Sequence, residues 1–228
     1  MKRGLQLDRV VLLGRTLEEY RRYFTLDLSS LKGKAILDVA SGVSSFCADA
    51  HDQGLNVTAA DRIYNLSPEE IELRCVHDLD HVVQSVHGLD TYRWDFYRNP
   101  EYLRTFRERA YKRFLEDYRT HGNRRYVPVE LPKLPFADEQ FDLTLVSYLL
   151  FVYEDQLSYD FHKESIAEIM RVTSGEARIY PIVTFEAKRS TFLDRLPEDF
   201  PSLHFEEVKT DFEFLRGSNY YLSIKHHH

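Results

Sequence analysis

The clearest potential for chemistry lies in two apolar segments, each with a carboxylate near its end. Residues 35–39 are apolar except for Asp38, a turn of small residues around Gly42 follows, and the second segment ends at Asp61, 19 positions after Gly42. In a βαβ unit, small residues after the first strand let the backbone approach a nucleoside, and an acid ending the second strand accepts hydrogen bonds from ribose hydroxyls. The spacing therefore predicts a nucleoside-binding crevice.

The composition of the turn argues against a dinucleotide. The pattern G-x-G-x-x-G seats a pyrophosphate on a helix N-terminus, whereas residues 40–45 contain a single glycine, Gly42. Asp38 would place negative charge where a pyrophosphate must lie, and it suits a cationic amino group instead. An alternative role for Asp38 is to accept hydrogen bonds from the N–H groups of the turn that follows. A nicotinamide-dependent dehydrogenase is therefore disfavoured.

These residues resemble the cofactor motif of the class I S-adenosylmethionine-dependent methyltransferases, in which an acid precedes small residues at alternate positions. Residues 134–147 resemble the loop and fourth strand of that family, usually L-P-F-x-D-x-x-F-D-x-V. Residues 164–183 resemble the helix, glycine turn and fifth strand that follow. Ala40 and Ser44 depart from the pattern, because the family commonly has glycine there. The resemblance implies S-adenosylmethionine as the cofactor and methyl transfer as the activity.

The resemblance also implies roles for particular side chains. Asp61 is expected to hold the ribose, Glu130 to accept from the exocyclic amine of the adenine, and the backbone N–H of Leu131 to meet a ring nitrogen. The full cofactor-binding set comprises Asp38, Ala40, Gly42, Asp61, Arg62, Glu130, Leu131 and Ser147.

The acceptor is expected near residues 147–153, after the fourth predicted strand. Tyr148 and Tyr153 are candidates for substrate contact, with core packing as the alternative. The segment lacks [D/N]-P-P-[Y/F/W], and no Pro-Cys pair is present, so methylation of DNA bases is disfavoured. Methyl transfer depends mainly on alignment, but a hydroxyl or ammonium acceptor also needs a general base. The catalytic residue stays unknown: His162 is a candidate, although it shares an apolar helical face with Ile166, which favours a structural histidine.

Helix signals locate the elements that would position these residues. Thr16-x-x-Glu19 is a capping box that predicts a helix before the first strand, and helices are also predicted to begin at Ser67-Pro68 and Asn99-Pro100. A doubly wound fold needs only one crossover helix between its second and third strands. Residues from about 62 to 125 are therefore predicted to form a helical insertion, a candidate lid, substrate selector or dimer surface.

The predicted fold class is α/β. We expect a doubly wound, Rossmann-like sheet of seven strands, mostly parallel, with a C-terminal antiparallel hairpin over residues 205–211 and 219–225. Residues 1–225 would form one methyltransferase domain. Residues 226–228, all histidine, are interpreted as a tag remnant.

Composition restricts the partners. The 228 residues carry a formal net charge of −7, which makes nucleic acid an unlikely partner, and no apolar run approaches the roughly 20 residues of a membrane helix. Cys47 and Cys75 are predicted to be reduced thiols, in keeping with the cytoplasm. His77 and His81 lack a third ligand, so no metal is expected.

A small-molecule acceptor is favoured, and the basic residues of 91–125 favour an anionic one. The alternatives are a non-catalytic sensor or scaffold that binds S-adenosyl compounds, and methylation of RNA or protein. The sequence does not give the oligomeric state.

Overall fold

The computed structural model describes residues 9–227, which contain a seven-stranded mixed sheet in the order β3-β2-β1-β4-β5-β7-β6. The first five strands in this order are parallel, and the pairs β5–β7 and β6–β7 are antiparallel. This is the Rossmann-like fold predicted from the sequence. The strands are β1 (Ala35–Val39), β2 (Asn56–Asp61), β3 (Tyr126–Pro128), β4 (Phe141–Ser147), β5 (Thr173–Tyr180), β6 (Leu203–Lys209) and β7 (Tyr220–His226).

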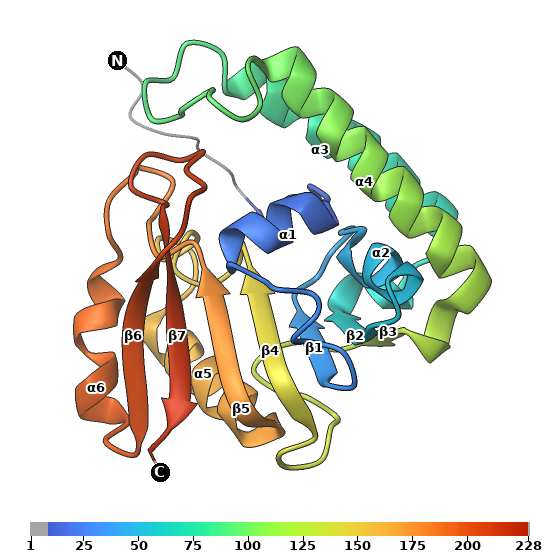
Figure 1. Ribbon diagram of the computed structural model, residues 1–228. Helices are drawn as coiled ribbons and strands as arrows, with labels where there is room; N and C mark the ends of the chain where they lie inside the picture. Colours follow the sequence, from blue (N-terminus) through green and yellow to red (C-terminus); the bar gives the residue numbers. More distant parts are fainter. Residues whose placement is uncertain (1–8, 228) are drawn as a thin grey trace.

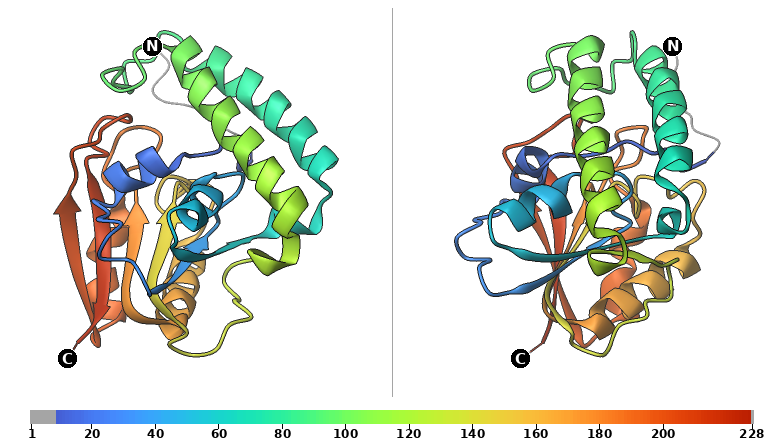
Figure 2. Two further views of the ribbon diagram at one scale, coloured as in Figure 1. Left: turned by 45° about the vertical axis from the view of Figure 1, so that its right-hand side comes forward. Right: turned by 90° about the vertical axis from the view of Figure 1, so that its right-hand side faces the viewer.

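Helices cover both faces of the sheet. One face carries α1 and α2, the other carries α5 and α6, and the long helices α3 and α4 lie side by side beyond the carboxyl ends of the parallel strands (Figures 1 and 2). The helices are α1 (Leu17–Tyr23), α2 (Phe46–Asp52), α3 (Pro68–Ser85), α4 (Pro100–His121), α5 (Tyr159–Val172) and α6 (Leu196–Asp199), with short 3₁₀ turns η1 (Arg62–Asn65), η2 (Gly122–Arg124) and η3 (Thr191–Asp194).

The insertion between β2 and β3 forms because its caps and its apolar pattern agree. Ser67 and Glu70 make a reciprocal capping box before α3, and the Asn99 side chain accepts from the N–H of Tyr102 at the start of α4. Both helices begin with proline, whose missing N–H is not needed there. Each helical segment has one apolar face, and that face is buried. The buried residues are Ile71, Cys75, Leu79, Val82, Val83 and Val86 from α3 and the residue that follows it, and Leu103, Phe106, Ala110, Tyr111, Phe114 and Tyr118 from α4.

The predicted glycine turn before the fifth strand is wrong. β5 begins at Thr173, directly after α5, so Gly175 lies inside the strand. A Cβ atom at Gly175 would stand 2.3 Å from the carbonyl oxygen of Asp142, beside a register shift between Phe141 and Leu143. Glycine is therefore needed here for the close approach of two backbones and not for a turn.

The terminal hairpin is present with shifted bounds, because β7 runs to His226. That residue pairs with Leu203, and its ring nitrogen lies 3.1 Å from the carbonyl oxygen of Thr173. The sheet thus includes one of the three histidines interpreted as a tag remnant, and His228 lies outside the described residues.

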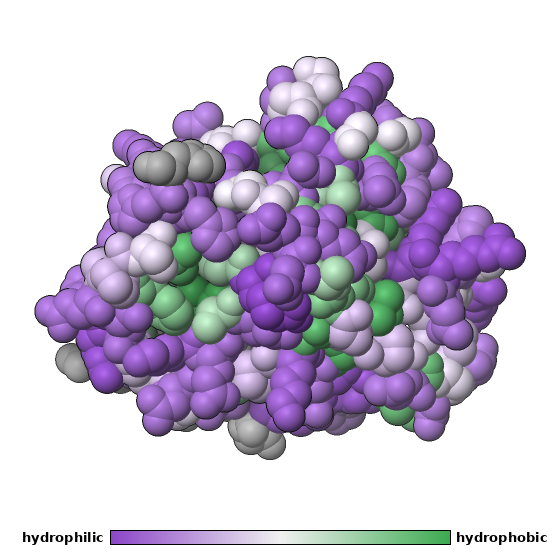
Figure 3. Space-filling view, turned by 90° about the horizontal axis from the view of Figure 1, so that it is seen from below, coloured by the Kyte–Doolittle hydropathy of each residue, from purple (hydrophilic) through white to green (hydrophobic). Residues whose placement is uncertain are grey.

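The surfaces at the two ends of the parallel strands differ in character. Seen from below, at the amino ends of the parallel strands, the surface is mainly hydrophilic with small apolar recesses (Figure 3). In the described part of the chain, no helix combines the length and apolar composition needed to cross a membrane. A cavity opens at the opposite side, at the carboxyl ends of the parallel strands, under α1 and the helical pair.

Candidate functional site

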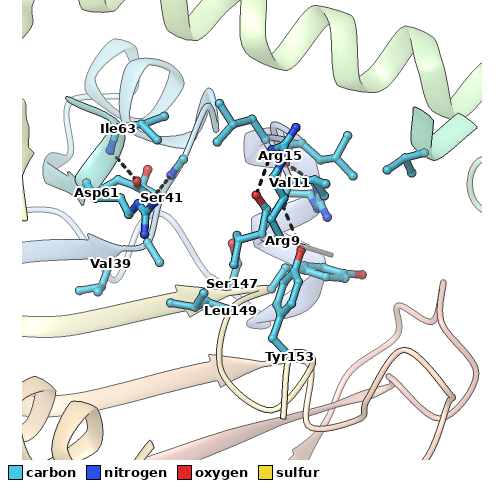
Figure 4. Close-up of a pocket in the computed structure, with 18 of the residues that line it drawn as sticks. Arg9, Val11, Arg15, Val39, Ser41, Asp61, Ile63, Ser147, Leu149 and Tyr153 are labelled. Atoms are coloured by element: carbon cyan, nitrogen blue, oxygen red, sulfur yellow. Dashed lines mark hydrogen bonds between the residues drawn. The ribbon is translucent and has the colours of Figure 1, made fainter. Parts of the chain in front are cut away.

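A cavity of about 390 Å³ lies at the carboxyl ends of β1, β2 and β4. This volume falls within the usual range for small-molecule sites, roughly 300 to 1,000 Å³. One end is formed by the residues that follow β1, β2 and β3, here called the nucleoside half. The other end is formed by α3, α4 and the loops after β4, β5 and β6, here called the aromatic half. Figure 4 shows Val39, Ser41 and Asp61 in the first, Tyr153 in the second, and Ser147 with Leu149 between them.

The turn after β1 is held in the conformation that the nucleoside half requires. Gly42 has φ +55°, and Ala40 also lies in the left-handed region with φ +54°. Such a conformation costs a residue with a Cβ about 1–2 kcal/mol relative to glycine, which explains why the methyltransferase pattern has glycine at position 40. Ala40 therefore holds a strained left-handed conformation in this turn.

Asp61 fixes this turn from the neighbouring strand. Its Oδ2 accepts from the N–H of Gly42 at 2.9 Å, and its Oδ1 accepts from the N–H of Ile63 at 3.0 Å. Burial raises the pKa of Asp61, and these two hydrogen bonds act in the opposite direction. Each carboxylate oxygen can accept a second hydrogen bond. Asp61 can therefore hold the turn and still accept from a ligand in the cavity.

Asp38 lies beneath the cavity and not in its wall. The side chain is fully buried, and both of its oxygens accept from the Tyr20 hydroxyl at 3.0 and 3.1 Å. The same hydroxyl lies 2.9 Å from Oγ of Ser147, which does line the cavity. Burial raises the pKa of Asp38 to about 7. Any influence of Asp38 on a ligand would act through Tyr20 and Ser147, and its direct contact with the cofactor stays a prediction.

The other predicted cofactor residues are brought together in the cavity wall. Arg62 and Glu130 are exposed at its rim, where they form an ion pair at 3.3 Å. Surface pairs of this kind contribute little to stability. The predicted residues that line the cavity are Ala40, Gly42, Asp61, Arg62, Glu130, Leu131, Ser147, Tyr148 and Tyr153.

The extended segment before α1, residues 10–15, passes along the cavity. The N–H of Leu12 donates to the buried Asp78 of α3 at 2.8 Å, and the N–H of Val11 donates to the Tyr153 hydroxyl at 3.3 Å (Figure 4). At Gly14 the segment is pressed between the turn and α4, because a Cβ there would stand 2.5 Å from the carbonyl oxygen of Val43. This segment joins the turn after β1 to the helical insertion.

A buried ion pair connects α1 to α4 beside the cavity. Arg107 lies 2.7 Å from Oε1 of Glu19, donates to the Tyr97 hydroxyl at 2.6 Å, and donates to the carbonyl oxygen of Gly14 at 2.6 Å. Glu19 also accepts from Tyr97 and from Tyr23. Burial alone would raise the pKa of Glu19, but the charge and hydrogen bond of Arg107 outweigh it and lower this pKa to about 2. Glu19 is therefore ionised across the physiological range.

Comparison with known proteins identifies one relative with clear sequence similarity. The chain is 43% identical over 225 residues to the "Uncharacterized protein MJ0045" of Methanocaldococcus jannaschii, an alignment that covers 98% of this chain and 99% of that protein. The chain belongs to the same family as MJ0045. No protein-family model matches it.

Solved structures place the fold of this MJ0045 family member. It resembles the "Mitomycin 7-O-methyltransferase MmcR" with a TM-score of 0.50 and 13% identity, over 92% of this chain and 54% of that one. A weaker likeness, with a TM-score of 0.49 and 15% identity, is to the "PH0226 protein from Pyrococcus horikoshii OT3", over 92% of this chain and 86% of that one. The fold is that of the class I S-adenosylmethionine-dependent methyltransferases.

In this member of the MJ0045 family, His162 lies away from the cavity. Its side chain is fully buried, its Nε2 accepts from the N–H of Phe151 at 3.0 Å, and its Nδ1 lies 2.8 Å from the carbonyl oxygen of Ser158. Both ring nitrogens are thus engaged, and burial lowers the pKa of His162. This geometry agrees with the structural role that its helical face favoured, because it positions the loop after β4.

Several residues of the site were not singled out from the sequence. Glu19 was noticed only as part of a capping box, and Arg107 only as one of many basic residues in its segment. The aromatic residues of the cavity come from loops far apart in the sequence, so no local pattern marks them. The missed cavity or network residues are Arg15, Glu19, Asp78, Tyr92, Arg107, Phe185 and Phe214.

Proposed function

We propose that this protein transfers a methyl group from S-adenosylmethionine to a small-molecule acceptor. The observation that carries the proposal is the continuity of one cavity from the turn around Gly42, past Ser147, to an aromatic half closed by the helical insertion. A nucleoside cofactor and a second small molecule can therefore lie end to end in it. The methyltransferase-like fold supports the same function, as does the O-methyltransferase named among its structural relatives.

The residues present fit the cofactor. Asp61 keeps acceptor capacity for the ribose hydroxyls after binding Gly42 and Ile63, and Glu130 and Leu131 line the cavity beside it, where the adenine would lie. Gly42 lets the backbone come close to the ligand, since no side chain projects from the turn there. When bound, S-adenosylmethionine would supply an electrophilic methyl group.

The chain supplies a route for a proton. Ser147 lines the cavity, its Oγ lies 2.9 Å from the Tyr20 hydroxyl, and Tyr20 donates to Asp38. A carboxylate with a pKa of about 7 is well matched to accept a proton near neutral pH. We infer that an acceptor hydroxyl would pass its proton through Ser147 and Tyr20 to Asp38, while the cavity wall holds the reacting groups in line.

Ligand-dependent melting tests the cofactor assignment. At about a hundred times its dissociation constant, S-adenosylhomocysteine should add roughly 2.7 kcal/mol, a rise of about 5–10 °C for a chain of this size. Asp61→Ala should lower the affinity about tenfold or more, because hydrogen bonds to a charged group are lost. Glu206→Ala is the control, since Glu206 is exposed on β6 outside the cavity. No shift with wild type, or an equal shift with NAD, would contradict the proposal.

A second candidate is a sensor that binds S-adenosyl compounds without transferring a methyl group. The observation that favours it is that, among the described residues lining the cavity, the only carboxylates are Asp61 and Glu130, both in the nucleoside half. Incubation with isotopically labelled S-adenosylmethionine and a metabolite extract separates the two. Label transferred by wild type and lost in Asp61→Ala supports the enzyme, whereas binding without transfer supports the sensor.

A further inference from the structure

A buried arginine in the cavity wall forms no direct ion pair with a carboxylate of residues 9–227. Arg15 is 9% exposed, and its Nε atom has no hydrogen-bond partner among residues 9–227. Its Nη1 donates to the carbonyl oxygen of Leu13, and no ion pair joins its guanidinium to a carboxylate of the described chain. A buried charge normally has a paired partner, because its removal from water is costly.

The nearby buried carboxylate, that of Glu19, is already paired with Arg107 and cannot neutralise Arg15 in addition. Glu19 is paired with Arg107 at 2.7 Å and accepts further hydrogen bonds from Tyr97 and Thr16. Two guanidinium groups thus share one carboxylate, which leaves one excess positive charge beside the cavity. A bound S-adenosylmethionine would increase the positive charge, since its sulfonium and amino groups outnumber its carboxylate.

The guanidinium of Arg15 is held in place at the junction of the two halves. It stacks over the ring of Tyr148 with its Cζ 4.2 Å from the ring centroid, and both side chains line the cavity. The carbonyl oxygen of Arg15 accepts from Oγ of Ser44 and from the N–H of Ser45, both at 2.9 Å, which anchors the residue to the turn after β1. Little side-chain entropy is left to lose when an anion binds, and a guanidinium can pair with a carboxylate through two hydrogen bonds.

The aromatic half defines what would accompany the anion. Tyr92 and Phe214 lie with ring centroids 4.7 Å apart, and Tyr153 and Phe185 make an edge contact at 5.0 Å. All four line the cavity. Aromatic walls favour a flat apolar body, which can stack on ring faces or meet their edges.

We propose that the acceptor is a planar, largely apolar molecule with a carboxylate group, and that this carboxylate pairs with Arg15. The apolar body lies among the four aromatic side chains Tyr92, Tyr153, Phe185 and Phe214. The inference rests on the proposed function, because it assigns the aromatic half to the acceptor. It disfavours cationic amines, which the excess positive charge would repel, and neutral molecules, which would leave Arg15 uncompensated.

Matched ligands test the charge requirement on the wild-type protein. With S-adenosylhomocysteine saturating, 2-naphthoate and related aromatic carboxylates are compared with their neutral primary amides by calorimetry. We expect the carboxylates to bind at least about tenfold more tightly than the amides. Equal binding of acid and amide, or binding of neither, would overturn the proposal. This arm needs no variant, so it holds even if substitutions at Arg15 impair folding.

Variants then test whether Arg15 is the residue that binds the carboxylate, and whether that carboxylate belongs to the acceptor or to the cofactor. Arg15→Gln should lose the preference for the acid, Arg15→Lys should keep part of it, and the control Arg21→Gln, on the exposed side of α1, should bind as wild type does. The affinity for S-adenosylhomocysteine should change less than about twofold in Arg15→Gln. If that affinity falls while binding of 5′-methylthioadenosine, which lacks the amino-acid tail, is unchanged, then Arg15 holds the cofactor's own carboxylate and the proposal is wrong. Failure of wild type to bind S-adenosylhomocysteine at all would instead refute the proposed function.

Discussion

Replacing Glu19 with glutamine should destabilise the protein strongly, because it leaves buried positive charge without a partner. Glu19 is fully buried and carries the ion pair with Arg107 on which α1, α4 and Tyr97 converge. Glutamine keeps the size of the side chain but removes the charge and replaces one acceptor oxygen with an NH2 donor. The substitution therefore separates charge and hydrogen bonding from packing.

The magnitude follows from the pKa of Glu19, which falls from 4.5 to about 2 on folding. A shift of this size corresponds to about 3 kcal/mol of stability at neutral pH, in agreement with the roughly 3–5 kcal/mol usually lost when one partner of a buried pair is removed. For a chain of this length, that is a fall in Tm of about 6–12 °C. Since the folded pKa lies below the unfolded value, the contribution is present above pH 4.5 and is lost as the pH falls toward 2.

Urea unfolding between pH 7 and pH 3, followed by the fluorescence of the single tryptophan, measures this contribution. Wild type should lose stability below pH 4.5 more steeply than Glu19→Gln. Glu18→Gln is the matched control, because Glu18 is on the same helix with a half-exposed side chain and should change stability by less than about 0.5 kcal/mol. Adding Arg107→Met to Glu19→Gln should restore much of the loss. A change below about 1 kcal/mol in Glu19→Gln, or a double variant as unstable as the sum of the two singles, would refute the reasoning.

Two further predictions concern the sheet and the proton route. Gly175→Ala should lower the free energy of unfolding by about 1–3 kcal/mol in chemical denaturation. The reason is that the new Cβ would stand 2.3 Å from the Asp142 carbonyl oxygen and force β4 and β5 apart. An unchanged free energy of unfolding would contradict this close approach of the two strands. Tyr20→Phe should lower the methyl-transfer rate by about 10²-fold or more and alter its pH profile near pH 7, because it breaks the hydrogen-bonded link from Ser147 to Asp38. The affinity for S-adenosylhomocysteine should be unchanged. An unchanged rate and pH profile would exclude the route.

The fold could be predicted from the sequence because its signals are local. Capping residues, proline at helix starts and the apolar period each act over a few positions, and they agreed with one another for α3 and α4. The prediction of a glycine turn before β5 is wrong for a related reason. Gly175 was interpreted from its neighbours in sequence, whereas its role is set by Asp142, more than thirty residues away.

The nucleoside half was predictable and the aromatic half was not. Gly42 follows β1 and Asp61 ends β2, the next parallel strand, so their spacing indicates that they meet, and a hydrogen bond of 2.9 Å joins them. Tyr92 and Phe214 come together only because the loop after α3 pairs with the segment before β7. Burial of charge is equally hidden, since Arg15 and Arg107 look like ordinary surface residues until the chain is folded around them.

Gly14 makes the first and last parts of the site mechanically dependent on one another. Its backbone lies directly between the Val43 carbonyl oxygen and Ala110 of α4, and the space there is too small for a side chain. A tilt of α4 would be transmitted across this contact to the turn around Gly42. The positions of α4 and of the turn are therefore coupled at Gly14, and any side chain at position 14 would have to displace one of them.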